Sequence, residues 1–163
     1  MDQGESVPGT LADVGEFGLI AAVTARFRHG PAVLLGPGDD AAVLAAPDGR
    51  VVASTDLLVE GQHFRLDWSN GYQVGRKAAA ANLADIAAMG ATPTALLVGL
   101  GAPGTLPVDW ALALADGLRD ECAPLGASVV GGDVIRAEAI TVAVTALGDL
   151  AGPGSALAGV SLR

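Results

Sequence analysis

Residues 69–102 read SNGYQVGRKAAAANLADIAAMGATPTALLVGLGA and predict a long helix followed by a buried strand. Ser69 and Asn70 are candidate N-terminal caps, because their side chains can accept hydrogen bonds from the free N–H groups of a first helical turn. Gly90 is placed to end the helix, as glycines commonly do. The apolar run 94–102 then predicts a strand inside the protein. Together the two elements indicate a helix that packs on a β-sheet.

Helices and strands alternate along the rest of the chain. Apolar residues at helical spacing predict further helices, and short apolar runs between turns predict strands. Residues 57–68 have the composition of a loop. This order predicts an α/β (α+β) fold in which a mixed β-sheet packs against helices. The expected helices are 16–27, 72–89 and 107–125, and the expected strands are 32–36, 41–46, 50–56, 94–102, 127–133 and 139–150.

One domain is expected for a chain of 163 residues. Residues 1–14 are interpreted as a flexible leader, and residues 15–150 as the folded domain. The tail 151–163 has loop composition and is assigned no element.

The chain is strongly acidic, with 18 acidic side chains against 9 basic ones and a net charge of −9. This charge disfavours nucleic acid and anionic membranes as partners, because phosphate binding relies on clustered Lys and Arg. No apolar run reaches the roughly 18 residues that a membrane-spanning helix needs. The N-terminus has no apolar signal segment, and a single cysteine, Cys122, is typical of a reducing compartment. A cytoplasmic location is therefore expected.

Aspartates recur where apolar segments end. Taken singly, Gly-Asp-Asp is typical of a turn, and an Asp at a strand end is commonly solvated. Asp85 differs because it lies inside an Ala-rich helix, where Asp is a poor helix former. Asn82 is expected on the same face as Asp85, and an exposed patch on this helix stays the alternative interpretation. The aspartates are Asp39 and Asp40 in GPGDDA, Asp56 in VVASTD, Asp85 in NLAD and Asp133 in VVGGD.

Ser54 and Thr55 add hydroxyl oxygens beside Asp56. Oxygen ligands without nearby Cys or His clusters suit Mg²⁺, a hard cation, better than zinc. The sequence therefore predicts that the aspartates share Mg²⁺ ions, which in turn hold phosphates. Arg76 and Lys77 could also contact phosphate, but a solvated helix end is the favoured interpretation of both.

The motifs GEFGLI, GDDAAV, STDLLVEGQHF, NLADIAAMGATP and GGD occur in this order between residues 15 and 133. Taken together, they resemble the N-terminal domain of the thiamine-monophosphate kinase family, and the resemblance covers residues 15–150. That family belongs to a larger group of ATP-binding enzymes with aminoimidazole ribonucleotide synthetase, selenophosphate synthetase and a hydrogenase maturation factor. GDDAAV and NLADIAAMGA are shared across the group, whereas STDLLVEGQHF favours the kinase.

The resemblance implies transfer of the ATP γ-phosphoryl group to thiamine monophosphate, which yields thiamine diphosphate and ADP. It also implies a homodimer in which the sheets of two subunits pair, with the nucleotide near the interface. His63 would face the substrate, and Gly132 with Asp133 would border the nucleotide. Carried over by position, the Mg²⁺ ligands would be Asp40, Ser54, Thr55, Asp56, Asp85 and Asp133.

Two features depart from the family pattern. Enzymes of the family have a second α/β domain with further metal and substrate ligands, and we expect that domain to be absent here. Ser155 also stands about where a nucleotide-contacting arginine is expected. Two alternatives therefore stay open. The chain could be another enzyme of the group, of the hydrogenase maturation or selenophosphate synthetase type, or a non-catalytic nucleotide-binding dimerisation module.

Overall fold

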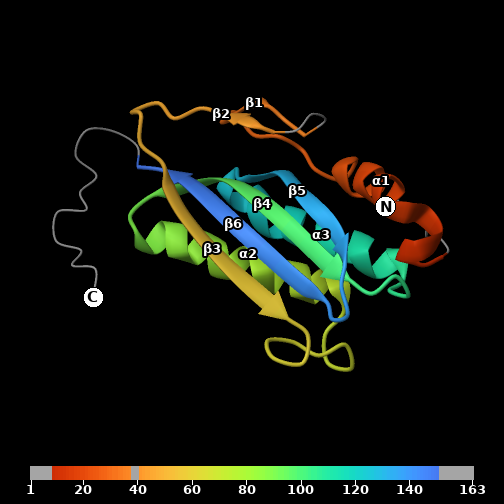
Figure 1. Ribbon diagram of the computed structural model, residues 1–163. Helices are drawn as coiled ribbons and strands as arrows, with labels where there is room; N and C mark the ends of the chain where they lie inside the picture. Colours follow the sequence, from red (N-terminus) through yellow and green to blue (C-terminus); the bar gives the residue numbers. More distant parts are fainter. Residues whose placement is uncertain (1–8, 38–40, 151–163) are drawn as a thin grey trace.

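A computed structural model describes residues 9–37 and 41–150, and its main feature is a twisted sheet with helices on one face (Figure 1). A separate two-stranded hairpin lies beside the sheet, and α1 lies at one end. The elements are α1 (Leu11–Thr24), β1 (Val33–Leu35), β2 (Val43–Leu44), β3 (Val52–Val59), α2 (Gly71–Ala88), β4 (Thr92–Ala102), α3 (Val108–Cys122), the 3₁₀-helix η1 (Ala123–Leu125), β5 (Ser128–Arg136) and β6 (Thr141–Asp149).

The main sheet has the strand order β3-β6-β4-β5. β4 and β5 run parallel, whereas β6 is antiparallel to both β3 and β4. The predicted mixed sheet is therefore present. β3 and β5, which carry most of the predicted site residues outside α2, form its two opposite edges.

The two faces of the sheet differ in what covers them. Along β6, Val142, Val144 and Ala146 are buried and belong to the core beneath the helices. The residues that alternate with them lie on the other face, because successive side chains of a strand point to opposite sides. α2 and α3 pack very closely behind the sheet, where a Cβ at Gly75 or Gly117 would collide with backbone of the facing helix.

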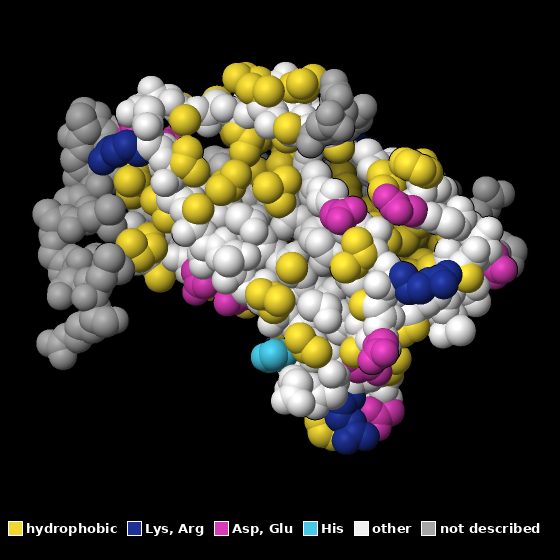
Figure 2. Space-filling view, viewed as in Figure 1, with side chains coloured by type: hydrophobic (Ala, Val, Ile, Leu, Met, Phe, Trp, Pro, Cys, Tyr) yellow, Lys and Arg dark blue, Asp and Glu magenta, His cyan; other side chains and the backbone are white. Residues whose placement is uncertain are grey.

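Several large apolar side chains are exposed on the open face of the sheet. Leu57 of β3, Leu97 of β4 and Ile135 of β5 are exposed by 55%, 38% and 59% on this side. Figure 2 shows hydrophobic side chains spread over the open face and over β1 and β2. Large apolar side chains exposed together on one face are typical of an interaction face.

Local signals predicted the helix ends well where a cap is present. Asn70 caps α2, and its side chain accepts a hydrogen bond from the Gln73 N–H at 2.9 Å. α1 begins at Leu11, before the predicted start at residue 16, because Thr10 and Asp13 form a capping box. Part of the segment interpreted as a leader is therefore helical. Gly15 then interrupts the helix with a φ of 68°, and the predicted helix follows it.

β3 is longer than predicted. It continues through Leu57, Leu58 and Val59, which the sequence placed in a loop. These residues pair with β6 as far as Thr141. Pairing with β6 therefore extends β3 to Val59. The sequence did not predict this extension, because polar residues follow Val59.

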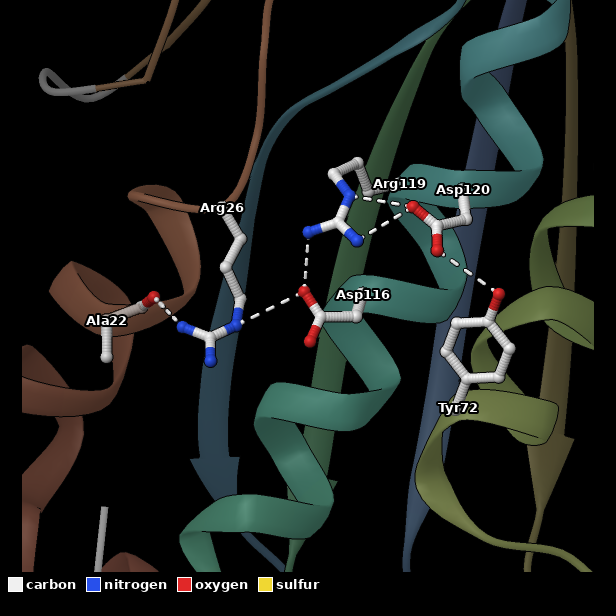
Figure 3. Close-up of polar contacts among 6 residues, drawn as sticks. All are labelled: Ala22, Arg26, Tyr72, Asp116, Arg119 and Asp120. Carbon is white, nitrogen blue, oxygen red and sulfur yellow. Dashed lines mark hydrogen bonds and ion pairs between the residues drawn. The ribbon is translucent and has the colours of Figure 1, made fainter. Parts of the chain in front are cut away.

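Polar contacts join the three helices (Figure 3). Asp116 of α3 accepts a hydrogen bond from Arg119 at 2.6 Å and lies 3.3 Å from Nε of Arg26, which follows α1. Tyr72 of α2 donates a hydrogen bond to Asp120 of α3, and this bond raises the pKa of Tyr72. The network therefore holds α1 and α2 to α3 and engages both arginines.

Cys122 is a small core residue at the end of α3, as predicted. Burial raises the pKa of its thiol to about 12. Among residues 9–37 and 41–150, no helix is both long and apolar enough to cross a membrane.

Candidate functional site

The structure brings Ser54 and Asp85 together at the edge of the sheet. Ser54 Oγ donates a hydrogen bond to Asp85 Oδ2 at 3.1 Å, across a separation of 31 residues in the chain. Asp56 lies two residues along β3, on the same face as Ser54, because their β6 partners Val144 and Ala146 are both buried under the helices. A hydroxyl and two carboxylates thus lie where β3 meets α2.

Thr55 lies on the opposite face of β3. Its β6 partner is Thr145, and the two hydroxyl oxygens are 3.0 Å apart on the open face. Thr55 Oγ1 also donates to the Val144 carbonyl oxygen. The side chain of Thr55 therefore does not join Ser54 and Asp56, although the three residues are neighbours in the sequence.

Asp133 lies at the other edge of the sheet. It pairs with Gly99 of β4, whose β6 partner is Ala143 on the open face. Three interstrand steps of about 4.8 Å separate β3 from β5, so the two strands are about 14 Å apart. A Mg²⁺ ion has ligands at about 2 Å, so one ion cannot contact both Asp56 and Asp133 of one chain.

Gly132 has a packing role that the sequence did not reveal. A Cβ at this position would collide with the carbonyl oxygen of Val98, because β5 and β4 approach closely beside a register shift. Packing alone therefore accounts for glycine here. Asp133 itself accepts a hydrogen bond from the adjacent Val134 N–H at 2.9 Å and has an exposed side chain.

Asn82 does not act together with Asp85, and that expectation is wrong. Asn82 is buried, and its Nδ2 donates to the Ala78 carbonyl oxygen of its own helix. Asp85 is exposed one turn later. Residues three apart on a helix are displaced by about 60° around its axis, and the border between core and surface falls between these two.

The loop after β3 fixes His63. The Val59 N–H donates to His63 Nδ1 at 3.0 Å, so in the neutral ring the proton is on Nε2. Phe64 is buried and stacks on Trp110 of α3, which anchors the loop to the core. The sequence did not anticipate a further contact, in which Lys77 Nζ of α2 donates to the His63 carbonyl oxygen. We call Ser54, Asp56, His63, Lys77 and Asp85 the β3–α2 seam.

The donor set of the seam fits Mg²⁺. Described residues contain no group of three or more His, Cys, Asp or Glu placed to hold a metal ion. Mg²⁺ does not need such a cage, because it usually keeps several waters and binds through one or two carboxylates and substrate phosphates. Ser54, Asp56 and Asp85 carry oxygen atoms of the kind that such a site would use. Asp40, the remaining predicted ligand, lies outside the described residues, as do Asp39 and the tail 151–163.

Comparison with known proteins gives the family. Residues 38–150 match the family described as AIR synthase related protein, N-terminal domain. The chain belongs to this family. The predicted resemblance and the predicted fold class are thereby confirmed, and the edge strands β3 and β5 both lie within the matched region of this AIR synthase related domain.

Several thiamine-monophosphate kinases are similar to this AIR synthase related domain. The enzyme of Mycobacterium tuberculosis is 53% identical over 143 residues, which are 88% of this chain and 43% of that enzyme. The structure of the enzyme from Stenotrophomonas maltophilia K279a is 34% identical with a TM-score of 0.69, covering 88% of this chain and 44% of that one. AaThiL complexed with AMPPCP and TMP is 25% identical with a TM-score of 0.58, over the same shares. The chain therefore spans less than half the length of these relatives.

Proposed function

We propose that this chain is the ATP- and Mg²⁺-binding part of a thiamine-monophosphate kinase, which phosphorylates thiamine monophosphate to thiamine diphosphate in the cytoplasm. The observation that carries the proposal is the contact of Ser54 with Asp85, beside Asp56 on the same face of β3. All three residues lie in the part of the chain that matches the family. Relatives named thiamine-monophosphate kinase support the substrate, and AaThiL was solved with AMPPCP, an ATP analogue, and TMP.

The proposed phosphoryl transfer does not require a nucleophile from the protein. Phosphoryl transfer depends mainly on positioning and on stabilising charge over phosphate oxygens, and bound Mg²⁺ supplies that stabilisation. Asp56 and Asp85 would hold the metal, and the Ser54 hydroxyl orients the Asp85 carboxylate by its hydrogen bond. His63, held through Nδ1, would present its Nε2–H to the substrate.

We further propose that the enzyme is a homodimer in which a second copy of the chain covers the open face. Asp133 and Gly132 of one copy would then border the nucleotide held at the β3–α2 seam of the other. Two features support this arrangement. The open face exposes several large apolar side chains, and β3 and β5 are too far apart for one chain to join Asp56 and Asp133 on one ion.

A second candidate function is a nucleotide-holding module that does not catalyse by itself. The chain matches 43% of the length of the Mycobacterium tuberculosis enzyme, so the catalytic activity of these residues alone is a separate question from nucleotide binding. Magnesium-dependent binding of ATP without turnover would support this candidate.

The test is isothermal titration of the chain with a non-hydrolysable ATP analogue, with and without Mg²⁺. We expect binding that requires Mg²⁺ and that Asp56→Ala or Asp85→Ala abolishes, with the fold retained by circular dichroism. Glu138→Ala is the matched control, because Glu138 is an exposed carboxylate in the turn before β6. Unchanged binding in both Asp variants would contradict the seam as the metal site. Formation of thiamine diphosphate from ATP and thiamine monophosphate separates the kinase from the non-catalytic module.

A further inference from the structure

The basic side chains of this acidic protein are mostly engaged with carboxylates. Arg76, the neighbour of Lys77 on α2, pairs with Glu121 of α3 at 2.7 Å. Lys77, in contrast, forms no ion pair within the described part of the chain, and its one hydrogen bond goes to a neutral carbonyl oxygen. The other ion-paired arginines are Arg26, Arg50, Arg65 and Arg119.

Lys77 belongs to the same seam as the predicted metal ligands. β3 leads through the His63 loop into α2, and α2 runs back along β3, so Lys77 lies near the end of β3 and Asp85 near its beginning. Eight residues separate Lys77 from Asp85 on the helix, which is about 12 Å along the axis. Asp56 lies on β3 between the two contacts that tie α2 to this region.

A small side chain lies between the two charges on the helix. Ala81 lies one turn from Lys77 and one turn from Asp85, and it is exposed. Residues four apart share a helix face, so the three side chains form one row. The methyl group of Ala81 leaves space between a cation at one end of the row and a carboxylate at the other.

We propose that Lys77 binds the phosphate of thiamine monophosphate, an inference that rests on the proposed function. Phosphoryl transfer must bring the acceptor phosphate close to the γ-phosphate of ATP, and two anions at such a distance repel each other strongly. The ammonium group of Lys77 has three N–H donors, of which the His63 carbonyl oxygen uses one. Lysine acts on phosphate as a point charge, and no carboxylate of residues 9–37 or 41–150 forms an ion pair with Lys77. The Nε2–H of His63 adds a donor beside it.

Lys77 also tethers the His63 loop, and a test must separate the tether from phosphate binding. Two variants do so. Lys77→Met removes both the charge and the donor, whereas Lys77→Gln removes the charge and keeps N–H donors for the carbonyl oxygen. Arg76→Met is the matched control, because it removes one positive charge from the adjacent position outside the seam.

The experiment is isothermal titration of the unsubstituted chain and the three variants with thiamine monophosphate, with thiamine, and with the Mg²⁺-bound ATP analogue. Loss of a charged hydrogen bond predicts a fall in affinity for thiamine monophosphate of about ten- to a hundred-fold in Lys77→Met and Lys77→Gln. Affinity for thiamine, which has no phosphate, and for the nucleotide should stay unchanged. Arg76→Met should bind all three ligands like the unsubstituted chain.

The outcomes are distinguishable. Full affinity for thiamine monophosphate in Lys77→Gln with a loss in Lys77→Met shows a tether alone and overturns the proposal. An equal loss for thiamine and thiamine monophosphate in both variants also overturns it, because the effect then does not depend on the phosphate. If the unsubstituted chain binds neither thiamine monophosphate nor nucleotide, the proposed function fails, and the inference fails with it.

Discussion

Both edge strands of the sheet carry predicted site residues, but tertiary contacts hold such residues in place only at the β3 edge. At the β3 edge, Ser54 and Asp85 contact each other from different elements, and His63 is held by Val59 and Lys77. At the β5 edge, the Asp133 carboxylate accepts a hydrogen bond from the N–H of its neighbour Val134. Tertiary contacts thus arrange the β3 edge, whereas at the β5 edge Asp133 presents an exposed carboxylate beside apolar side chains of the open face.

Two motifs that we propose act together therefore do not meet within one chain. The order of the strands places STD and GGD at opposite edges. In the proposed dimer, a second copy that covers the open face would bring the β5 edge of one chain to the β3 edge of the other. Variants at the two edges can therefore test whether a site is shared between two chains.

The largest effect is expected from subunit mixing. Asp56→Ala and Asp133→Ala should each fail to bind the nucleotide with Mg²⁺ when alone. After exchange of subunits in an equal mixture, half of the dimers carry both variants, and each such dimer has one intact site, so binding should recover to about a quarter of the normal capacity. Titration with the ATP analogue measures the recovery.

The control for mixing is Asp56→Ala with Asp85→Ala. Both changes lie in the β3–α2 seam, so no mixed dimer has an intact site, and no recovery is expected. No recovery in the first mixture would show that each site is built within a single chain. Recovery in the control would show that Asp56 and Asp85 of one site come from different chains, and would contradict the seam.

A smaller effect is expected from the glycines of β5. In Gly132→Ala the new methyl group meets the Val98 backbone, which cannot move freely, whereas in Gly131→Ala it meets only the end of the Leu97 side chain at 3.2 Å. Overpacking typically lowers the free energy of unfolding by about 1–3 kcal/mol, and we expect a loss of this size or greater for Gly132→Ala alone. Urea denaturation without ligands measures it. Equal stability of the two variants would remove the packing explanation for Gly132.

The smallest expected effect is a difference in the free energy of unfolding between variants at the two edges, measured without ligand. Ser54→Ala should lower the free energy of unfolding by about 0.5–1 kcal/mol, because it removes the partner of Asp85. Asp133→Ala should change it by less than about 0.5 kcal/mol, as is usual for an exposed side chain. A larger loss in Asp133→Ala than in Ser54→Ala would contradict the view that only the β3 edge is organised in advance.

Much of the fold could be predicted because its signals are local. Asn70 caps α2, and Gly90 and Gly126 follow the helical segments with positive φ, as their positions suggested. The prediction failed where distant partners decide the outcome. β3 continues to Val59 because β6 lies beside it.

The candidate site was predictable in its residue types and only partly in its arrangement. Ser54 and Asp85 were expected near each other, and they are in contact. Thr55 faces away because of strand alternation, and Asn82 is buried because α2 packs with that side inward. The sequence favours a solvated side chain for Lys77. Its neighbours in the sequence do not indicate the contact with the His63 carbonyl oxygen, which is 14 residues away.

The sequence by itself determined the family, the order of helices and strands, and the carboxylates and hydroxyls that suit Mg²⁺, because caps, periodicity and motifs are written in neighbouring residues. Only the tertiary structure decided which of these side chains meet. Strand order separates Asp56 from Asp133, helix direction joins Asp85 to Ser54 and Lys77 to His63, and the open face stays available to a partner. Each of these depends on packing between elements distant in the chain, which no local pattern specifies.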